Sequence, residues 1–161
     1  MNFPPRRVVT GHDPQGRAVI TSDRVVDNQV VRRAGHRSFV LWMTDEVPAH
    51  DLDGPDPAEL TTLDRSVPEG TVFRIVEYGP GVSPARHRTD SIDYAVVLSG
   101  EIDLVLDGQT VHLQAGDTLV QRATAHDWAN NGEQPCVIAF CLVGARREGA
   151  PGPDAGPPSP G

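Results

Sequence analysis

Residues 79–100 read GPGVSPARHRTDSIDYAVVLSG, and the spacing inside this stretch is the most informative feature of the chain. Five residues separate Gly81 from His87, five separate His87 from Asp93, and six separate Asp93 from Gly100. Few unrelated sequences would combine one histidine, one carboxylate and one terminal glycine at these intervals.

A second stretch complements the first. Residues 116–131 read GDTLVQRATAHDWANN, in which a short β-run leads to His126. Two separated strands could bring His87, Asp93 and His126 to one point inside a β-barrel. Side chains alternate along a strand, so the neighbours at even spacing would share the face of each of these residues.

The two stretches resemble the two motifs of the cupin superfamily, G-x5-H-x-H-x3,4-E-x6-G and G-x5-P-x-G-x2-H-x3-N. The resemblance covers roughly residues 70–145, and six positions match: Gly81, His87, Gly100, Gly116, His126 and Asn130. The chain departs from the motifs where Thr89 replaces a histidine, Asp93 replaces the glutamate, and Arg122 and Thr124 replace a proline and a glycine. One residue is also missing before the second histidine.

The resemblance implies an all-β fold, a double-stranded β-helix or jelly-roll cupin barrel with extra N-terminal strands. With no internal repeat, 161 residues of 38% hydrophobic content predict one such barrel. The expected parts are an N-terminal β extension packing on the barrel (1–46), a Pro/Asp-rich loop or lid (47–70), the barrel (71–145) and a disordered tail (146–161). The pair Asp107-Gly108 is the clearest hairpin signal.

Composition excludes several classes of chemistry and partner. All fourteen basic residues are arginine, so a Schiff-base lysine, pyridoxal phosphate and a lysine-bearing nucleotide loop are excluded. The formal charge is −8 and no basic run exceeds two residues, which argues against a nucleic-acid partner. No apolar run has membrane-spanning length and no leader sequence is evident, so we expect a cytoplasmic protein that does not bind a membrane. Exposed strand edges predict a homodimer.

The candidate catalytic residues are His87, Asp93 and His126. Two histidines and one carboxylate form the facial triad of non-haem Fe(II) sites, so the same three residues are candidate metal ligands. The cofactor is either one divalent metal (iron, nickel, zinc or manganese) or none. Without a metal, a histidine can take a proton near pH 7 while Asp93 orients it.

Five residues are candidates for substrate binding: Arg74, Thr89, Tyr94, Gln121 and Trp128. Thr89 shares the parity of His87, and Trp128 shares that of His126. Parity leaves open whether Arg74 and Gln121 face the cavity, and Tyr94 has the parity opposite to Asp93. We expect His12, His36, His50 and His112 at the surface.

The favoured function is a small-molecule lyase or isomerase (dehydratase, cyclase or decarboxylase type) that uses His/Asp acid–base chemistry. The resemblance adds that small cupins occur among such enzymes, some of them in specialised metabolism. Two alternatives stay open: a non-haem Fe(II) dioxygenase using the His87, Asp93 and His126 triad, and a non-catalytic small-molecule-binding cupin.

Overall fold

The structure, a computed structural model, describes residues 3–50, 56, 69–82 and 85–146. Throughout this part the regular elements are strands, and it contains no helix. The first four strands are β1 (Arg6–His12), β2 (Ala18–Val25), β3 (Gln29–Arg33) and β4 (His36–Thr44). The others are β5 (Thr71–Tyr78), β6 (Ser91–Ser99), β7 (Glu101–Val105), β8 (Thr110–Gln114), β9 (Thr118–Arg122), β10 (Asp127–Ala129) and β11 (Cys136–Gly144).

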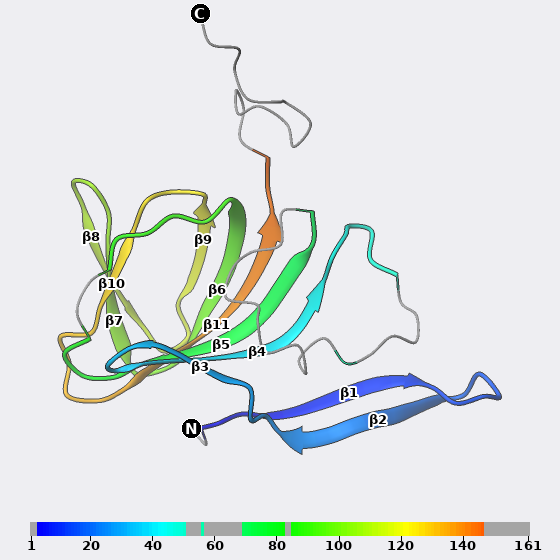
Figure 1. Cartoon of the computed structure of the whole chain (residues 1–161). Helices are drawn as coiled ribbons and strands as arrows, with labels where there is room; N and C mark the ends of the chain where they lie inside the picture. Colours follow the sequence, from blue (N-terminus) through cyan, green and yellow to red (C-terminus); the bar gives the residue numbers. More distant parts are fainter. Residues whose placement is uncertain (1–2, 51–55, 57–68, 83–84, 147–161) are drawn as a thin grey trace, which may run out of the picture.

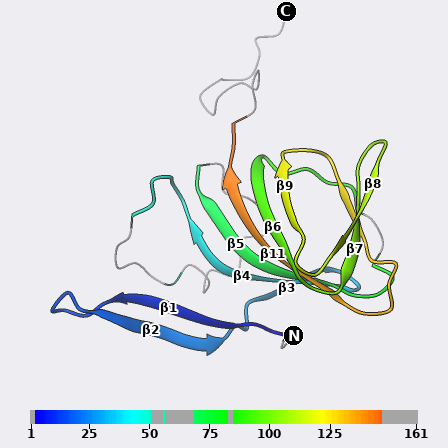
Figure 2. The ribbon, with the colours of Figure 1, turned by 180° about the vertical axis from the view of Figure 1, so that it is seen from behind.

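The strands form three antiparallel sheets (Figure 1). The largest has the order β3-β4-β5-β11-β6-β9, and a smaller one has the order β10-β7-β8. These two sheets curve around a common interior, whereas the hairpin β1-β2 projects away from them (Figure 2). The neighbours β5-β11-β6 are far apart in sequence, as expected for a jelly roll, and the all-β double-stranded β-helix is confirmed.

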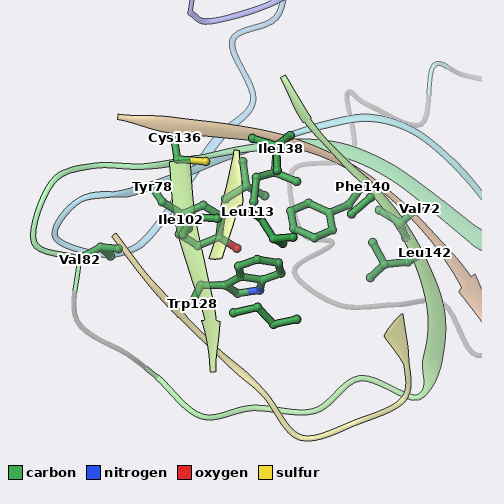
Figure 3. Packing of buried hydrophobic residues seen from close by; sticks show 14 of the residues in the cluster. Val72, Tyr78, Val82, Ile102, Leu113, Trp128, Cys136, Ile138, Phe140 and Leu142 are labelled. Carbon is green, nitrogen blue, oxygen red and sulfur yellow. The ribbon is translucent and has the colours of Figure 1, made fainter. Parts of the chain in front are cut away.

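The main core fills the space between the two sheets (Figure 3). Val72, Ile138 and Leu142 contribute from the large sheet, and Ile102 and Trp128 contribute from the small one. All five side chains are almost completely buried. This packing explains the alternating apolar pattern of β5, β6 and β11, since every second residue of these strands points inward.

A second apolar cluster lies on the outer face of the large sheet. Its buried members are Val26, Phe39, Leu41, Ile75 and Val137. Phe3 covers it with its ring edge-on to Phe39, 5.1 Å between centroids, so the chain before β1 packs on the barrel. The hairpin β1-β2 is held at its base by Arg7, which donates to the carbonyl of Leu41 and pairs with Asp56.

Two turns connect the strands of the small sheet β10-β7-β8 to each other and to the large sheet. The predicted Asp107-Gly108 hairpin joins β7 to β8, with the Leu106 amide donating to the Gln109 carbonyl at 2.8 Å. Gly100 joins β6 to β7 with a φ of 75°, and a Cβ there would lie 2.4 Å from the carbonyl oxygen of Pro135. Only glycine fits this turn, which accounts for the terminal glycine of the first motif.

Most of the predicted loop at 47–70 and nearly all of the predicted tail at 146–161 lie outside the described residues. The described part of the chain contains no helix that is long and apolar enough to cross a bilayer.

Candidate functional site

A cavity of about 770 Å³ reaches into the barrel between the two sheets. Its walls come from β3 to β6 and β11 of the large sheet, from β10 of the small sheet, and from residues 85–90. The cavity therefore lies where the two sequence motifs meet, with His87, Asp93 and His126 all in its lining.

A single antiparallel bridge brings the two motif histidines together. The His87 amide donates to the His126 carbonyl at 3.1 Å, and the His126 amide donates back at 3.0 Å. The two imidazole rings lie 4.2 Å apart between centroids. The described residues on either side of His87 add no ladder to this isolated bridge.

Backbone carbonyls fix the tautomer of each ring. His87 Nδ1 lies 2.9 Å from the carbonyl oxygen of Ala85, and His126 Nδ1 lies 2.9 Å from that of Thr124. A carbonyl oxygen only accepts, so each Nδ1 carries the proton and each Nε2 carries a lone pair. In its neutral form each histidine can therefore accept a proton or a hydrogen bond at Nε2.

Asp93 is buried on β6, with 4% of its surface exposed. Its carboxylate accepts hydrogen bonds from Ser91 Oγ at Oδ1, and from Thr89 Oγ1 (3.3 Å) and Gln121 Nε2 (3.1 Å) at Oδ2. Three donors stabilise the buried charge, so Asp93 is held in one position. Thr89 occupies the place of the second histidine of the first motif. It donates to the Asp93 carboxylate at the cavity wall.

Gln121 connects Asp93 to His126. It pairs with Asp93 across the β6-β9 ladder, and its Nε2 lies 3.2 Å from His126 Nε2 as well as donating to Asp93. One amide nitrogen thus uses its two hydrogens on the carboxylate and the imidazole. Asp93 therefore orients His126 through Gln121, which is not itself among the cavity-lining residues. The parity of Asp93 and Gln121 would have indicated this contact only if the register of β6 and β9 had been known.

Burial distinguishes the two histidines. His126 has 2% of its surface exposed, and burial lowers its pKa, so the ring is neutral near pH 7. His87 lies at the exposed rim of the cavity. In the described part of the chain its Nε2 has no hydrogen-bond partner, so it can reach both solvent and a molecule in the cavity.

The described residues do not assemble a three-ligand metal centre. Among them no group of three His, Cys, Asp or Glu side chains converges closely enough to hold an ion. The carboxylate oxygens of Asp93 both accept hydrogen bonds, and His126 Nε2 already faces Gln121. Among the described residues His87 is the one member of the triad whose ligand atom makes no hydrogen bond, so the donor set as arranged does not present three converging ligands to one ion.

The remaining predicted residues divide between the inside and the outside of the barrel. Arg74 and Trp128 line the cavity, and Arg74 shares its face of β5 with the buried Val76. Tyr94 is 51% exposed on the outer face of β6, because it has the parity opposite to Asp93. The proposed site therefore does not include Tyr94.

His36, which the sequence led us to expect at the surface, is buried at 9% exposure in the cavity wall. This expectation was wrong because β4 pairs with β5, which sets His36 opposite Tyr78 with ring centroids 5.4 Å apart. Arg32 and Arg33 at the end of β3 line the same part of the cavity. No motif marks these residues, and the long-range β4-β5 pairing that places them cannot be read from local spacing.

Known proteins resemble the chain over this same region. The sequence model of the family described as "Cupin domain" matches residues 74–143. The cupin-domain-containing oxidoreductase fogC of Aspergillus ruber is 37% identical over 147 residues, covering 85% of this chain and 71% of that protein. Phomopsin biosynthesis cluster protein C' of Diaporthe leptostromiformis is 38% identical over 137 residues, covering 78% and 70%.

Among solved structures, the Cupin 2 conserved barrel domain protein of Salinispora arenicola superposes with a TM-score of 0.47 and 18% identity. The superposition covers 73% of this chain and 78% of that one.

Proposed function

Since the chain belongs to the cupin superfamily, we propose that it is a small-molecule enzyme of specialised metabolism that moves a proton next to a carbonyl group. The reaction would be of the isomerase or lyase type. The name of one relative, a biosynthesis cluster protein, supports a role in specialised metabolism. The arrangement of the site supports the acid–base chemistry.

The observation that carries the proposal is the pair of imidazoles with fixed tautomers. The ring centroids of His87 and His126 lie 4.2 Å apart, and each Nδ1 hydrogen is donated to a backbone carbonyl. A general base needs an available lone pair within reach of the substrate, and His87 Nε2 at the cavity rim provides one. Solvent contact lets this ring lose its proton again after each turnover.

His87 Nε2 takes a proton from the carbon beside the carbonyl, and the electron pair of that C–H bond moves to the carbonyl oxygen. An arginine of the same cavity would stabilise the negative charge that develops there. Return of the proton to another carbon completes an isomerisation, whereas departure of a group from the neighbouring carbon completes an elimination.

The direct test is exchange of carbon-bound hydrogen in D₂O, followed by proton NMR. Suitable substrates are 4-oxo-4-phenylbutanoate and its amide, whose methylene hydrogens beside the ketone exchange slowly on their own. The proposal predicts protein-dependent exchange that falls at least about 100-fold in His87→Ala, in line with the weight of a general base. Arg17→Gln, in the turn of the β1-β2 hairpin, is the control. Undiminished exchange in His87→Ala would refute the role of this residue.

The names of several relatives favour a second candidate function, an oxidoreductase. As a non-haem Fe(II) dioxygenase the chain would need His126 and Asp93 as ligands besides His87, so Gln121 would have to leave both of them. An oxygen electrode separates the candidates. Consumption of oxygen that requires added Fe(II) and substrate would favour the dioxygenase, and proton exchange under nitrogen would favour the acid–base enzyme.

A further inference from the structure

Positive charge is concentrated inside the cavity of an acidic protein. The chain has a formal charge of −8, yet five arginines and two aspartates line the cavity: Arg32, Arg33, Arg74, Arg86, Arg88, Asp90 and Asp93. Arg86 also pairs with Asp107. Asp93 is used within the protein, since Thr89 and Gln121 donate to it. The cavity therefore has a local excess of positive charge, which would attract an anion against the charge of the whole molecule.

Three of these arginines gather around the buried rings of His36 and Tyr78. Burial lowers the pKa of His36 to about 4, and the strongest charge effects in the same direction come from Arg33 and Arg32. The same arginines and Arg74 favour the ionised form of Tyr78, against the burial that raises its pKa. The positive field of Arg32, Arg33 and Arg74 thus converges on one part of the cavity wall.

Two buried nitrogen atoms in this wall have no hydrogen-bond partner among the described residues: Nδ1 of His36 and Nε of Arg33. The side chain of His36 is more than nine-tenths buried, and both residues line the cavity. A buried polar atom without a partner is costly, so native structures seldom contain one unless a ligand or water satisfies it. The polar groups of this wall are therefore not fully satisfied within the described part of the chain.

A chain of ring contacts connects this wall to the two motif histidines. Tyr78 lies 5.4 Å from His36 and 5.9 Å from Trp128, and Trp128 lies 6.0 Å from His126. Phe140 adds a fifth ring, 5.8 Å from Trp128. An apolar or aromatic body could lie along these rings, with a charged end toward the arginines and a reactive end toward His87.

We infer that the cavity wall formed by Arg32, Arg33, His36 and Arg74 binds an anionic group of the substrate, so that the enzyme acts on organic acids. The guanidinium groups would hold the oxyanion, with the apolar body of the acid against Trp128. This inference rests on the proposed function, because it assigns the substrate class of the same cavity. It makes Arg33 and Arg74 determinants of specificity.

The oxyanion could be a carboxylate or a phosphate ester, because the guanidinium fork fits both. Three probes with a common phenyl group separate the possibilities: 3-phenylpropanoate, 2-phenylethyl phosphate and the neutral 3-phenylpropanamide. Binding of each is measured by ligand-detected NMR titration against the whole chain. At least one anion should bind about ten times more tightly than the amide. The anion that binds better shows whether the wall prefers a carboxylate or a phosphate ester.

Variants then assign the binding to the wall. Arg33→Gln and Arg74→Gln should each weaken the anion about tenfold and leave the amide unchanged, whereas Arg17→Gln on the hairpin should change neither. Circular dichroism confirms that each variant is folded. Equal affinity for anion and amide, no binding of any probe, or anion binding that survives in both arginine variants would overturn the inference.

The same titration distinguishes the inference from the proposed function. His87→Ala should bind the anion as the unmodified chain does while losing proton exchange. Anion binding without any proton exchange in the unmodified chain would contradict the acid–base function and leave the anion site intact. Exchange of the ketone amide as fast as that of the ketone acid would support the function and contradict the anion site.

Discussion

Gln121 is the residue on which the arrangement of the site depends most. Its amide lies between a buried carboxylate and a buried imidazole, and it donates to Asp93 while facing His126 at 3.2 Å. Asp93 replaces the longer glutamate of the cupin motif, and Gln121 on the neighbouring strand β9 links its carboxylate to the His126 ring.

Gln121→Leu should lower the free energy of unfolding by about 1–3 kcal/mol, because a buried carboxylate loses a donor and the leucine cannot replace it. Urea denaturation at pH 7 measures the change. The matched control is Val120→Thr on the same strand, whose side chain is 59% exposed on the outer face. Equal stability of Gln121→Leu and the control would mean that the amide bridge contributes nothing.

His36 should make the stability of the protein depend on pH. Its pKa is about 4 in the folded chain and about 6.5 in the unfolded one, so between these values the unfolded state binds more protons. The contribution of neutral His36 is complete above pH 6.5 and is lost as the pH falls to 4. After allowance for solvent screening we expect a loss of about 1–2 kcal/mol.

His36→Gln, which cannot titrate, should show a smaller decrease in stability over the same pH range. Urea denaturation of both proteins at pH 7, 5.5 and 4 gives the comparison. Parallel pH profiles for the two proteins would contradict the depressed pKa.

At the scale of elements, the turns hold the strands at the spacing that the cavity requires. Gly100 closes the β6-β7 turn against the backbone of Pro135, with no room for a side chain. Ala123 adopts a φ of 50° in the turn after β9, which is the turn where the second cupin motif has its proline and glycine. The Ala123 amide donates to the Ser91 carbonyl at 3.1 Å, which ties the turn to the start of β6.

Gly100→Ala should destabilise the protein by more than about 2 kcal/mol, since the new Cβ would meet backbone atoms and the φ of 75° disfavours any side chain. The control is Gly108→Ala, where a Cβ would meet no atom within 4 Å. Thermal unfolding of both variants measures the difference. A similar melting temperature for the two would show that the β6-β7 turn can adjust.

Local spacing predicted the elements of the barrel better than it predicted their pairing. The two motifs marked β6, β9 and the His87–His126 meeting point, because a glycine turn and a strand parity are local properties of the sequence. The positions of His36 and Gln121 depend on which strands pair, through β4-β5 and β6-β9, and such register is set by tertiary packing. For that reason Arg32, Arg33 and His36 escaped the sequence analysis, whereas Arg74 and the histidine pair did not.

For the whole molecule, the homodimer expected from the exposed strand edges stays a prediction. Light scattering coupled to size-exclusion chromatography measures the mass directly. We expect twice the chain mass of 17.3 kDa, and a mass of one chain across the micromolar range would contradict the expectation.

We propose that side chains of this molecule, with His87 as the base, move the proton without a metal. The measurement that tests it most directly is hydrogen exchange of 4-oxo-4-phenylbutanoate in D₂O by protein treated with EDTA, with its metal content determined in parallel. Metal-free protein should exchange the substrate as fast as untreated protein does. Exchange that disappears with the metal and returns on addition of Fe(II) or another divalent ion would contradict it.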